Sequence, residues 1–115
     1  MLRPSSSSVR VFYPRFSREE VLARLSAGVE ALSAVLPLAR VVLFGPWATG
    51  RQTAASDIDV LVVYQGEPRD DAFAAAKRLL DLRGVEPHVY TEDEAARVAP
   101  VLARMTRAGV VLYRR

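Results

Sequence analysis

The sequence predicts a small α/β domain with a mixed β-sheet and helices packed mainly on one face. The chain has 115 residues, half of them apolar, which is enough for one modest hydrophobic core. Short runs rich in β-branched residues alternate with longer segments whose apolar residues recur at helical spacing. We expect a single domain over residues 17–115, preceded by a flexible segment over residues 1–16 that contains a low-complexity serine run.

Three helices are expected from apolar spacing and capping signals. The first, over residues 17–36, begins with a Ser-x-x-Glu capping box and carries one apolar stripe. The second, over residues 70–83, places Phe73 among the side chains that face the sheet and ends before a glycine. The third begins with a Thr-x-x-Glu capping box at residues 91–94, and Pro100 interrupts or restarts it.

Short β-branched and aromatic runs predict the strands, over residues 9–13, 41–44, 58–63, 85–90 and 110–113. The first of these is expected to be a short edge strand, because Pro14 stops it. A glycine-bounded loop, residues 45–56, joins the strands over 41–44 and 58–63. The rest of the chain is expected to hold this strand–loop–strand unit in place.

Two aspartates, Asp57 and Asp59, stand where the strand over residues 58–63 begins. Aspartate is depleted in strands, and residues two apart point to the same face, so these two carboxylates repel each other. Divalent cations with oxygen ligands relieve such repulsion, and phosphoryl-type chemistry uses them as a clamp. Helix capping or an exposed strand end is the structural alternative, but it explains neither the pairing nor the glycine loop.

Composition excludes several classes of function. The chain has no cysteine, so disulfides and thiolate metal sites are excluded. It has no apolar run of the roughly 18 residues needed to span a bilayer and no apolar region typical of a secretory signal, so we expect a cytoplasmic protein. The net charge is +3 and the arginines are scattered, so direct nucleic-acid binding is not expected, whereas attraction to a nucleoside triphosphate is compatible with the charge.

The strand–loop–strand unit resembles the minimal nucleotidyltransferases of the DNA polymerase beta-type superfamily. Their pattern is Gly-Ser-x-Ala-x-Gly, five residues, then Ser-Asp-(Ile/Leu)-Asp-(Leu/Val). The residues that fit it, with the spacing intact, are Gly45, Ala48, Gly50, Ser56, Asp57, Ile58, Asp59 and Val60. The likeness extends from about residue 17 to residue 91, and it implies the nucleotidyltransferase fold.

The resemblance implies a Mg²⁺-dependent transfer of a nucleoside monophosphate, AMP from ATP, to a hydroxyl group. Asp57 and Asp59 would bind the metal, and Glu86 on a neighbouring strand would be the third carboxylate, although aspartate is commoner there. The residues expected to contact the nucleotide are Gly45, Pro46, Thr49, Arg51 and Ser56.

Two positions depart from the family pattern. Pro46 replaces the usual serine, which removes a hydroxyl and a backbone donor, and Thr49 stands where arginine is common. Ser56 is expected to bond to the backbone of residues 57–59 rather than act as a nucleophile. Trp47 is expected either to pack over the turn or to stack on a base, and His88 to be a packed or surface residue in preference to a base.

The resemblance also implies a partner. Minimal nucleotidyltransferases are often antitoxins that adenylylate a tyrosine of a small helical HEPN-type toxin. The chain is too short for an added acceptor-binding domain, so a partner or a second copy of the chain in a homo-oligomer must present the acceptor. Two alternatives stay open: a weak or inactive nucleotide-binding module that neutralises a partner by contact, and modification of a small molecule such as an antibiotic, which the missing acceptor domain disfavours.

Overall fold

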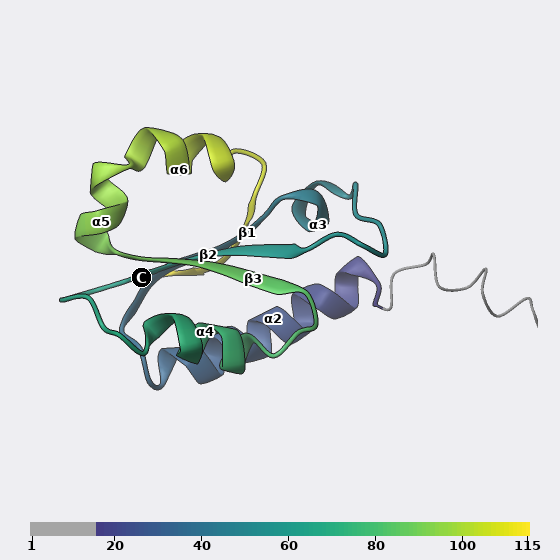
Figure 1. The fold of residues 1–115 in the computed structure, drawn as a ribbon. Coiled ribbons are helices and arrows are strands. Elements are labelled where there is room, and N and C mark those ends of the chain that lie inside the picture. The colour runs from purple at the N-terminus through teal and green to yellow at the C-terminus, as the bar shows by residue number, and fades with distance from the viewer. Residues whose placement is uncertain (1–15) are drawn as a thin grey trace, which may run out of the picture.

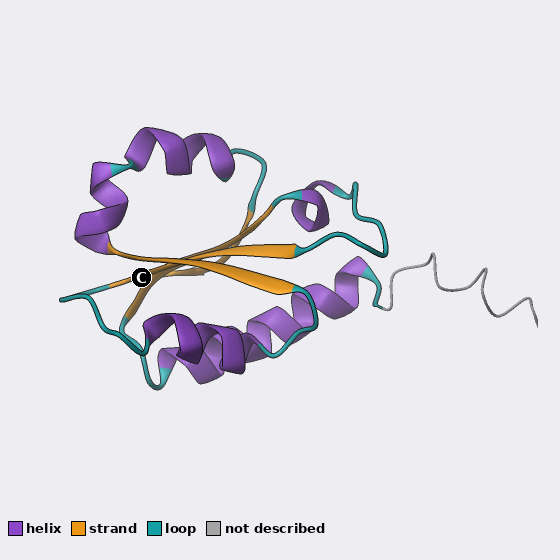
Figure 2. Cartoon of the chain, viewed as in Figure 1, coloured by secondary structure: helices purple, strands orange, loops and turns teal. Residues whose placement is uncertain are grey.

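A computed structural model of the chain describes residues 16–115, which form a four-stranded sheet between two layers of helices (Figures 1 and 2). The elements are α2 (Arg18–Ser33), β1 (Leu38–Phe44), α3 (Pro46–Thr49), β2 (Ile58–Tyr64), α4 (Ala72–Leu80), β3 (Val85–Thr91), α5 (Glu92–Arg97), α6 (Ala99–Met105) and β4 (Val110–Arg114). The strand expected over residues 9–13, and the flexible segment apart from Phe16, lie outside the described residues. Phe16 itself packs against the core, with the Arg24 guanidinium 4.4 Å from its ring centroid.

The sheet is mixed, as the sequence predicts. The strand order is β3-β2-β1-β4, with β2 parallel to β3 and β1 antiparallel to both β2 and β4. The register places Asp59 of β2 opposite Phe44 of β1 on one side and opposite Glu86 of β3 on the other. Residues opposite each other in a sheet share a face, so the register brings two of the predicted carboxylates together.

The larger core lies on the face of the sheet that α2 and α4 cover (Figure 1). The capping box predicted for α2 is present: the Ser17 hydroxyl accepts from the Glu20 N–H, and the Glu20 side chain accepts from the Ser17 N–H. Leu25 and Leu32 of α2 are fully buried. Gly28 lets α2 approach α4 closely, since a Cβ there would lie 2.7 Å from the Leu79 carbonyl oxygen. The two longest helices therefore share one face, in agreement with the sequence.

The opposite face is covered by the shorter helices α5 and α6, which enclose a smaller cluster. Its members are Val42, Phe44, Leu61, Val63, Ala95 and Leu102. The capping box predicted at residues 91–94 opens α5, and the chain breaks at Val98 before α6 restarts with Pro100 near its N-terminus. A proline is tolerated in the first turn of a helix, where its missing N–H would have no intrahelical partner.

Three local expectations differ from the structure. The helix α2 ends at Ser33 rather than at residue 36, and α4 ends at Leu80 because Asp81 adopts a left-handed conformation with φ of 46°. Phe73 does not face the sheet and is 49% exposed. The buried side of α4 consists of Ala72, Ala75, Ala76 and Leu80, so Phe73 points away from that stripe.

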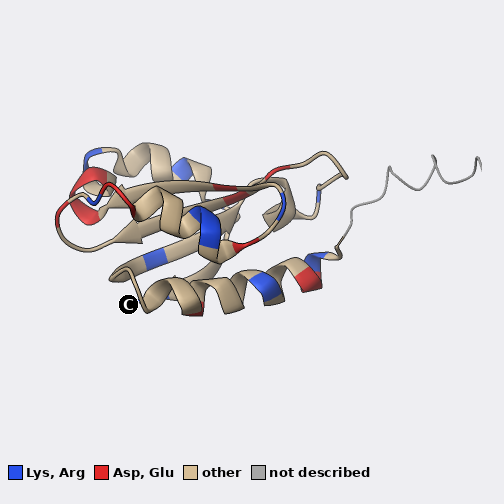
Figure 3. Ribbon diagram, turned by 60° about the horizontal axis from the view of Figure 1, so that its bottom comes forward, with Lys and Arg blue, Asp and Glu red and all other residues tan. Residues whose placement is uncertain are grey.

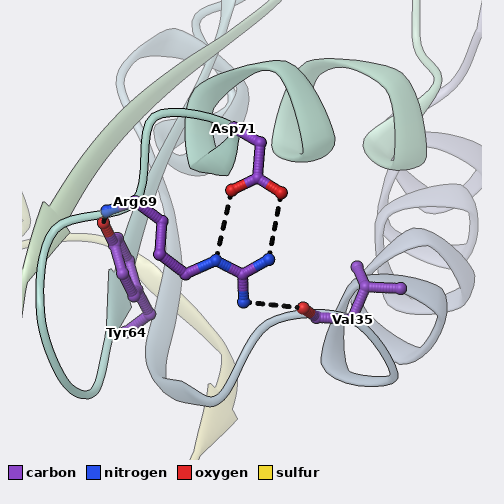
Figure 4. A network of polar contacts seen from close by, with 4 residues as sticks. All are labelled: Val35, Tyr64, Arg69 and Asp71. Atoms are coloured by element: carbon purple, nitrogen blue, oxygen red, sulfur yellow. Dashed lines mark hydrogen bonds and ion pairs between the residues drawn. The ribbon is translucent and has the colours of Figure 1, made fainter.

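The connection between β2 and α4 is fixed by Arg69 (Figure 4). The guanidinium of Arg69 donates to both carboxylate oxygens of Asp71, at 3.1 and 3.0 Å, and to the Val35 carbonyl. The backbone N–H of Arg69 donates to the Tyr64 hydroxyl. The hydrogen bond from Arg69 lowers the pKa of Asp71. The stability that this pair contributes is therefore present above the ordinary aspartate pKa and is lost as the pH falls through the lowered value.

Charged residues of both signs occur on helices, strands and loops (Figure 3). This agrees with the expectation that the arginines do not form one stripe. None of the helices within residues 16–115 is both long enough and apolar enough to cross a membrane.

Candidate functional site

The glycine loop is built on an unusual backbone conformation at Gly45. Its φ of 76° and ψ of −161° belong to a region that is essentially restricted to glycine. The absence of a Cβ has a second consequence, because a Cβ on Gly45 would lie 2.5 Å from Oδ2 of Asp59. The loop therefore passes directly over the first carboxylate inside β2.

The loop continues as the short helix α3, a helix that the sequence does not predict. Pro46 is its first residue, where the fixed φ of proline suits a helix and no intrahelical bond is lost. Because proline has no N–H, the N-terminus of this turn, which follows the residue that contacts Asp59, has one backbone donor fewer. The structure therefore explains how Pro46 is tolerated without restoring the donor.

The three predicted carboxylates come from adjacent positions at one end of the sheet. Asp59 is 24% exposed and stands beside Glu86 on the parallel neighbouring strand. Asp57 precedes Asp59 by two residues, and both Asp57 and Glu86 are exposed. The order of the chain and the strand register thus concentrate negative charge at this end of β2.

These carboxylates suit Mg²⁺ in chemistry, because hard divalent cations prefer oxygen ligands. Gly45 leaves the Asp59 carboxylate uncovered by a side chain, and Asp57 and Glu86 are exposed enough to change rotamer. Within residues 16–115, no three His, Asp or Glu side chains are gathered closely enough to hold a metal ion. The carboxylates therefore fit magnesium in their chemistry, and they would have to be drawn together when the metal and the triphosphate bind.

His88 packs beside the carboxylates rather than standing free as a base. Its Nε2 lies 3.5 Å from Oδ1 of Asp59, and its ring centroid is 5.1 Å from that of Phe44. Nε2 is buried and forms no hydrogen bond to any residue that the structure describes. The expectation of a packed histidine agrees with this environment.

Ser56 and Thr49 are both used inside the loop. The Ser56 hydroxyl accepts from the Thr53 N–H at 2.9 Å, so the expected bond to the backbone of residues 57–59 is wrong. Thr53 lies across a tight turn from Ser56, and the N–H of Ser56 also donates to its carbonyl. The Thr49 hydroxyl donates to the Pro46 carbonyl at 3.3 Å. The Arg51 side chain is exposed and makes no hydrogen bond within the described residues.

Trp47 packs over the turn and is only 5% exposed, so it is not available to stack on a base. Its indole N–H donates to the Ser56 carbonyl at 3.4 Å and ties α3 to the end of the loop. A pocket of about 200 Å³ lies next to it, and Asp57 and Arg83 are among its lining residues. A pocket of about 780 Å³ lies at the other end of β2.

Arg18 supports the loop from outside, and nothing in the local sequence predicts this role. Its Nε donates to the Trp47 carbonyl and its Nη2 to the Ala48 carbonyl, both at 3.0 Å, across about 30 residues of chain. A guanidinium at the C-terminal carbonyls of α3 also favours the helix dipole. Lys77 stabilises the start of β3 in a similar way, because its Nζ donates to the carbonyl of Val85, the residue before Glu86.

We expect Arg18→Met to lower the free energy of unfolding by about 2 kcal/mol, because two half-buried carbonyls lose a charged donor. Urea denaturation measures this change, and Arg78→Met on the exposed surface of α4 is the matched control. A loss no greater than that of the control would mean that the two bonds do not hold α3.

Comparison with known protein families identifies the family of this chain. The sequence model of the nucleotidyltransferase domain family matches residues 23–110. The chain belongs to this family. The match includes the glycine loop, both aspartates and Glu86. Among curated proteins, none is significantly similar to the chain.

Solved structures of nucleotidyltransferases and of toxin–antitoxin complexes share the fold. A protein from Sulfolobus solfataricus described as a nucleotidyltransferase has a TM-score of 0.63 and 23% identity, over 100% of this chain and 94% of that one. A chain of a toxin–antitoxin structure with AMP-PNP has a TM-score of 0.57 and 21% identity, over 78% and 73% of the two chains. A chain of the complex between the tri-AMPylated HEPN toxin and the MNT antitoxin of Shewanella oneidensis has a TM-score of 0.53 and 16% identity, over 86% and 74%. The nucleotidyltransferase family that the sequence predicts is confirmed by the family match, and these structures confirm the predicted fold.

Proposed function

We propose that this nucleotidyltransferase is a cytoplasmic, Mg²⁺-dependent adenylyltransferase that moves AMP from ATP to a hydroxyl group of a partner protein. The partner is a HEPN-type toxin and the acceptor a tyrosine, so the chain acts as an antitoxin. Support comes from the family and from similar structures that contain AMP-PNP or an AMPylated HEPN toxin with its MNT antitoxin.

The observation that carries the proposal is the position of Asp59. It lies against Gly45 of the glycine loop on one side and is aligned with Glu86 of β3 on the other. The glycine loop and a strand end that carries carboxylates therefore meet at one residue, which would let backbone amides and a metal act on the same triphosphate. A purely structural aspartate would need neither neighbour.

The proposed reaction uses these groups in distinct roles. Asp57, Asp59 and Glu86 would hold Mg²⁺, which supplies charge neutralisation at the triphosphate when it is bound. The tyrosine oxygen forms a bond to the α-phosphorus, and the bond from that phosphorus to the bridging oxygen of the β-phosphate breaks. Pyrophosphate leaves with the electron pair of that bond, and the hydroxyl proton passes to the Glu86 carboxylate. The Ala48 amide already donates to the Gly45 carbonyl, so the Trp47 amide is the backbone donor at the start of α3 that would meet the departing phosphates.

The test is intact-mass measurement of the partner after incubation with this protein, ATP and Mg²⁺. The partner to use is the product of a neighbouring reading frame that encodes a helical protein with an Arg-x4-His motif. We expect a mass increase of one or more AMP groups, located on tyrosine by peptide fragmentation. An unchanged mass with GTP, CTP and UTP as well as ATP would contradict the proposal.

Neutralisation by contact alone is the rival function, and Pro46 favours it because one phosphate-facing donor is missing. The two functions separate in a toxin-rescue experiment with Asp57→Asn. Loss of rescue supports transfer, whereas full rescue by a variant that transfers no AMP supports contact.

We expect Pro46→Ser to tighten ATP binding by about tenfold or more. The change restores an N–H and a hydroxyl at the start of α3, and each hydrogen bond to a charged oxygen contributes roughly 1.5–3 kcal/mol. Loss of the fixed φ of proline opposes this gain by less than about 1 kcal/mol. Calorimetric titration with a non-hydrolysable ATP analogue measures the effect, and weaker binding by Pro46→Ser would show that the loop does not contact phosphate through this position.

A further inference from the structure

A groove lies between the sheet and the α5–α6 layer, at the end of β2 away from the carboxylates. Its volume is about 780 Å³, which is within the range of pockets that hold a ligand or a group of partner side chains. Its apolar lining consists of Ala39, Val63, Ala95, Ala96, Ala99 and Ala103. No residue of the glycine loop and none of the three carboxylates lines this α5–α6 groove, so the proposed reaction leaves it unused.

The rim of the α5–α6 groove is basic. Arg40, Arg115 and Glu92 line it, and Arg115 is already paired with Glu92 at 3.0 Å. Arg40 stands directly opposite Arg114 in the antiparallel register of β1 and β4. Like charges directly opposite in a sheet are destabilising, and no carboxylate of the described residues lies within ion-pair distance of either guanidinium. The rim is therefore complementary to an anionic partner.

The groove and the carboxylates share one face of the sheet. Asp59 and Val63 are four residues apart on β2, so they point to the same side and are separated by about 13 Å. A protein chain anchored in the groove can therefore reach the carboxylates with a segment of only a few residues.

We propose that the α5–α6 groove binds the acceptor protein through a segment whose apolar side chains are flanked by Asp or Glu. The identity of the occupant as the acceptor rests on the proposed function. Its apolar side chains fill the alanine- and valine-lined floor, and its carboxylates pair with Arg40 of the rim and with Arg114, which lies opposite Arg40 on β4 just outside the lining of the groove. Anchoring there leaves the acceptor hydroxyl within reach of Asp59, so the α5–α6 groove contributes to recognition of the acceptor.

Charge favours an acidic partner segment over two other possible occupants of the groove, the N-terminal segment of the chain and a second copy of the chain. Residues 1–15 contain three arginines and no acidic residue, so the N-terminal segment of the chain is not complementary to the rim. A second copy seated groove to groove would oppose the same arginines to each other. A partner segment that carries both apolar and acidic side chains is the occupant that matches the apolar floor and the basic rim.

The test uses a fluorescein-labelled helical peptide with leucine on one face and glutamate elsewhere, and a matched peptide with lysine in place of glutamate. Fluorescence anisotropy with the whole chain is expected to show binding of the glutamate peptide at least about tenfold tighter than that of the lysine peptide. Arg40→Glu and Arg114→Glu are each expected to remove this preference. Ala103→Phe, which fills the groove, is expected to weaken binding of the glutamate peptide by about tenfold.

Matched controls lie on the opposite side of the sheet. Arg78→Glu and Ala74→Phe make the same changes on exposed positions of α4 and are expected to leave peptide binding unchanged. Equal binding of the two peptides, or equal losses in the controls, would overturn the inference. Tighter peptide binding after removal of residues 1–15 would assign the groove to the N-terminal segment of the chain itself. Self-association that Arg40→Glu abolishes would assign it to a second copy, and loss of ATP binding in Arg40→Glu would assign it to the nucleotide, so each of these results would also overturn the inference.

The two proposals fail separately. If the glutamate peptide binds as expected but no nucleotide is transferred to any partner, the adenylyltransferase proposal is wrong and the groove remains an acidic-segment site. If a partner is adenylylated equally well by wild type, Arg40→Glu and Ala103→Phe, the groove inference is wrong and the enzyme proposal stands.

Discussion

Replacing Asp59 with asparagine is expected to lower the rate of nucleotidyl transfer by about a thousandfold while leaving the fold intact. Asp59 is the carboxylate that lies against the glycine loop and beside β3. No other carboxylate can take its place unless the loop or the strand moves. Asparagine keeps the shape of the side chain, which limits the effect to charge. In metal-free buffer the free energy of unfolding should stay the same or rise by up to about 1 kcal/mol, because repulsion among the carboxylates is reduced.

Transfer is measured by intact mass of the acceptor, and stability by urea denaturation with and without Mg²⁺. Asp70→Asn, which changes an exposed aspartate before α4, is the control and should alter neither quantity. A large loss of stability in Asp59→Asn would show that the carboxylate has a structural partner, for which His88 is the candidate. Unchanged transfer would remove Asp59 from the proposed metal ligands.

The sequence predicts the parts of the fold and site that depend on local pattern. Both capping boxes are present because Ser17 and Thr91 each need only a residue three positions further along the chain. Asp57 and Asp59 fall at the same end of the sheet because they are two residues apart, with Asp57 directly before β2 and Asp59 inside it. Glu86 joins them through the parallel pairing of β2 with β3, which the family resemblance implies but the residues alone do not.

The features that sequence reasoning missed depend on distant contacts or on a small angular difference. Arg18 bonds to carbonyls about 30 residues away, and nothing near it in the chain marks that role. Phe73 lies one position away from the buried stripe of α4, so a shift of one residue in the helix start decides its exposure. The α5–α6 groove arises from how two short helices sit on the sheet, which no periodicity reveals.

Gly45→Ala is expected to be the most damaging single substitution in the loop, with a loss of about 3 kcal/mol in the free energy of unfolding and loss of transfer activity. The backbone of Gly45 lies in a region where a side chain costs roughly 1–3 kcal/mol. The new Cβ would also lie 2.5 Å from Oδ2 of Asp59, so the carboxylate must rotate away from its place beside the glycine loop. Strain and displacement therefore act together at one residue.

Gly50→Ala and a double variant separate these two causes. Gly50 also has a positive φ, 80°, but no atom lies within 4 Å of a Cβ built there, so its substitution should cost only about 1 kcal/mol and leave activity largely intact. Combining Gly45→Ala with Asp59→Ala removes the colliding oxygen, so the stability loss of the pair should be smaller than the sum of the single losses. Urea denaturation of the four variants measures this coupling. If Gly45→Ala costs no more than Gly50→Ala, or if the losses add, the contact between the glycine loop and Asp59 is not what fixes the carboxylate, and the argument that this residue joins the loop to the metal site fails.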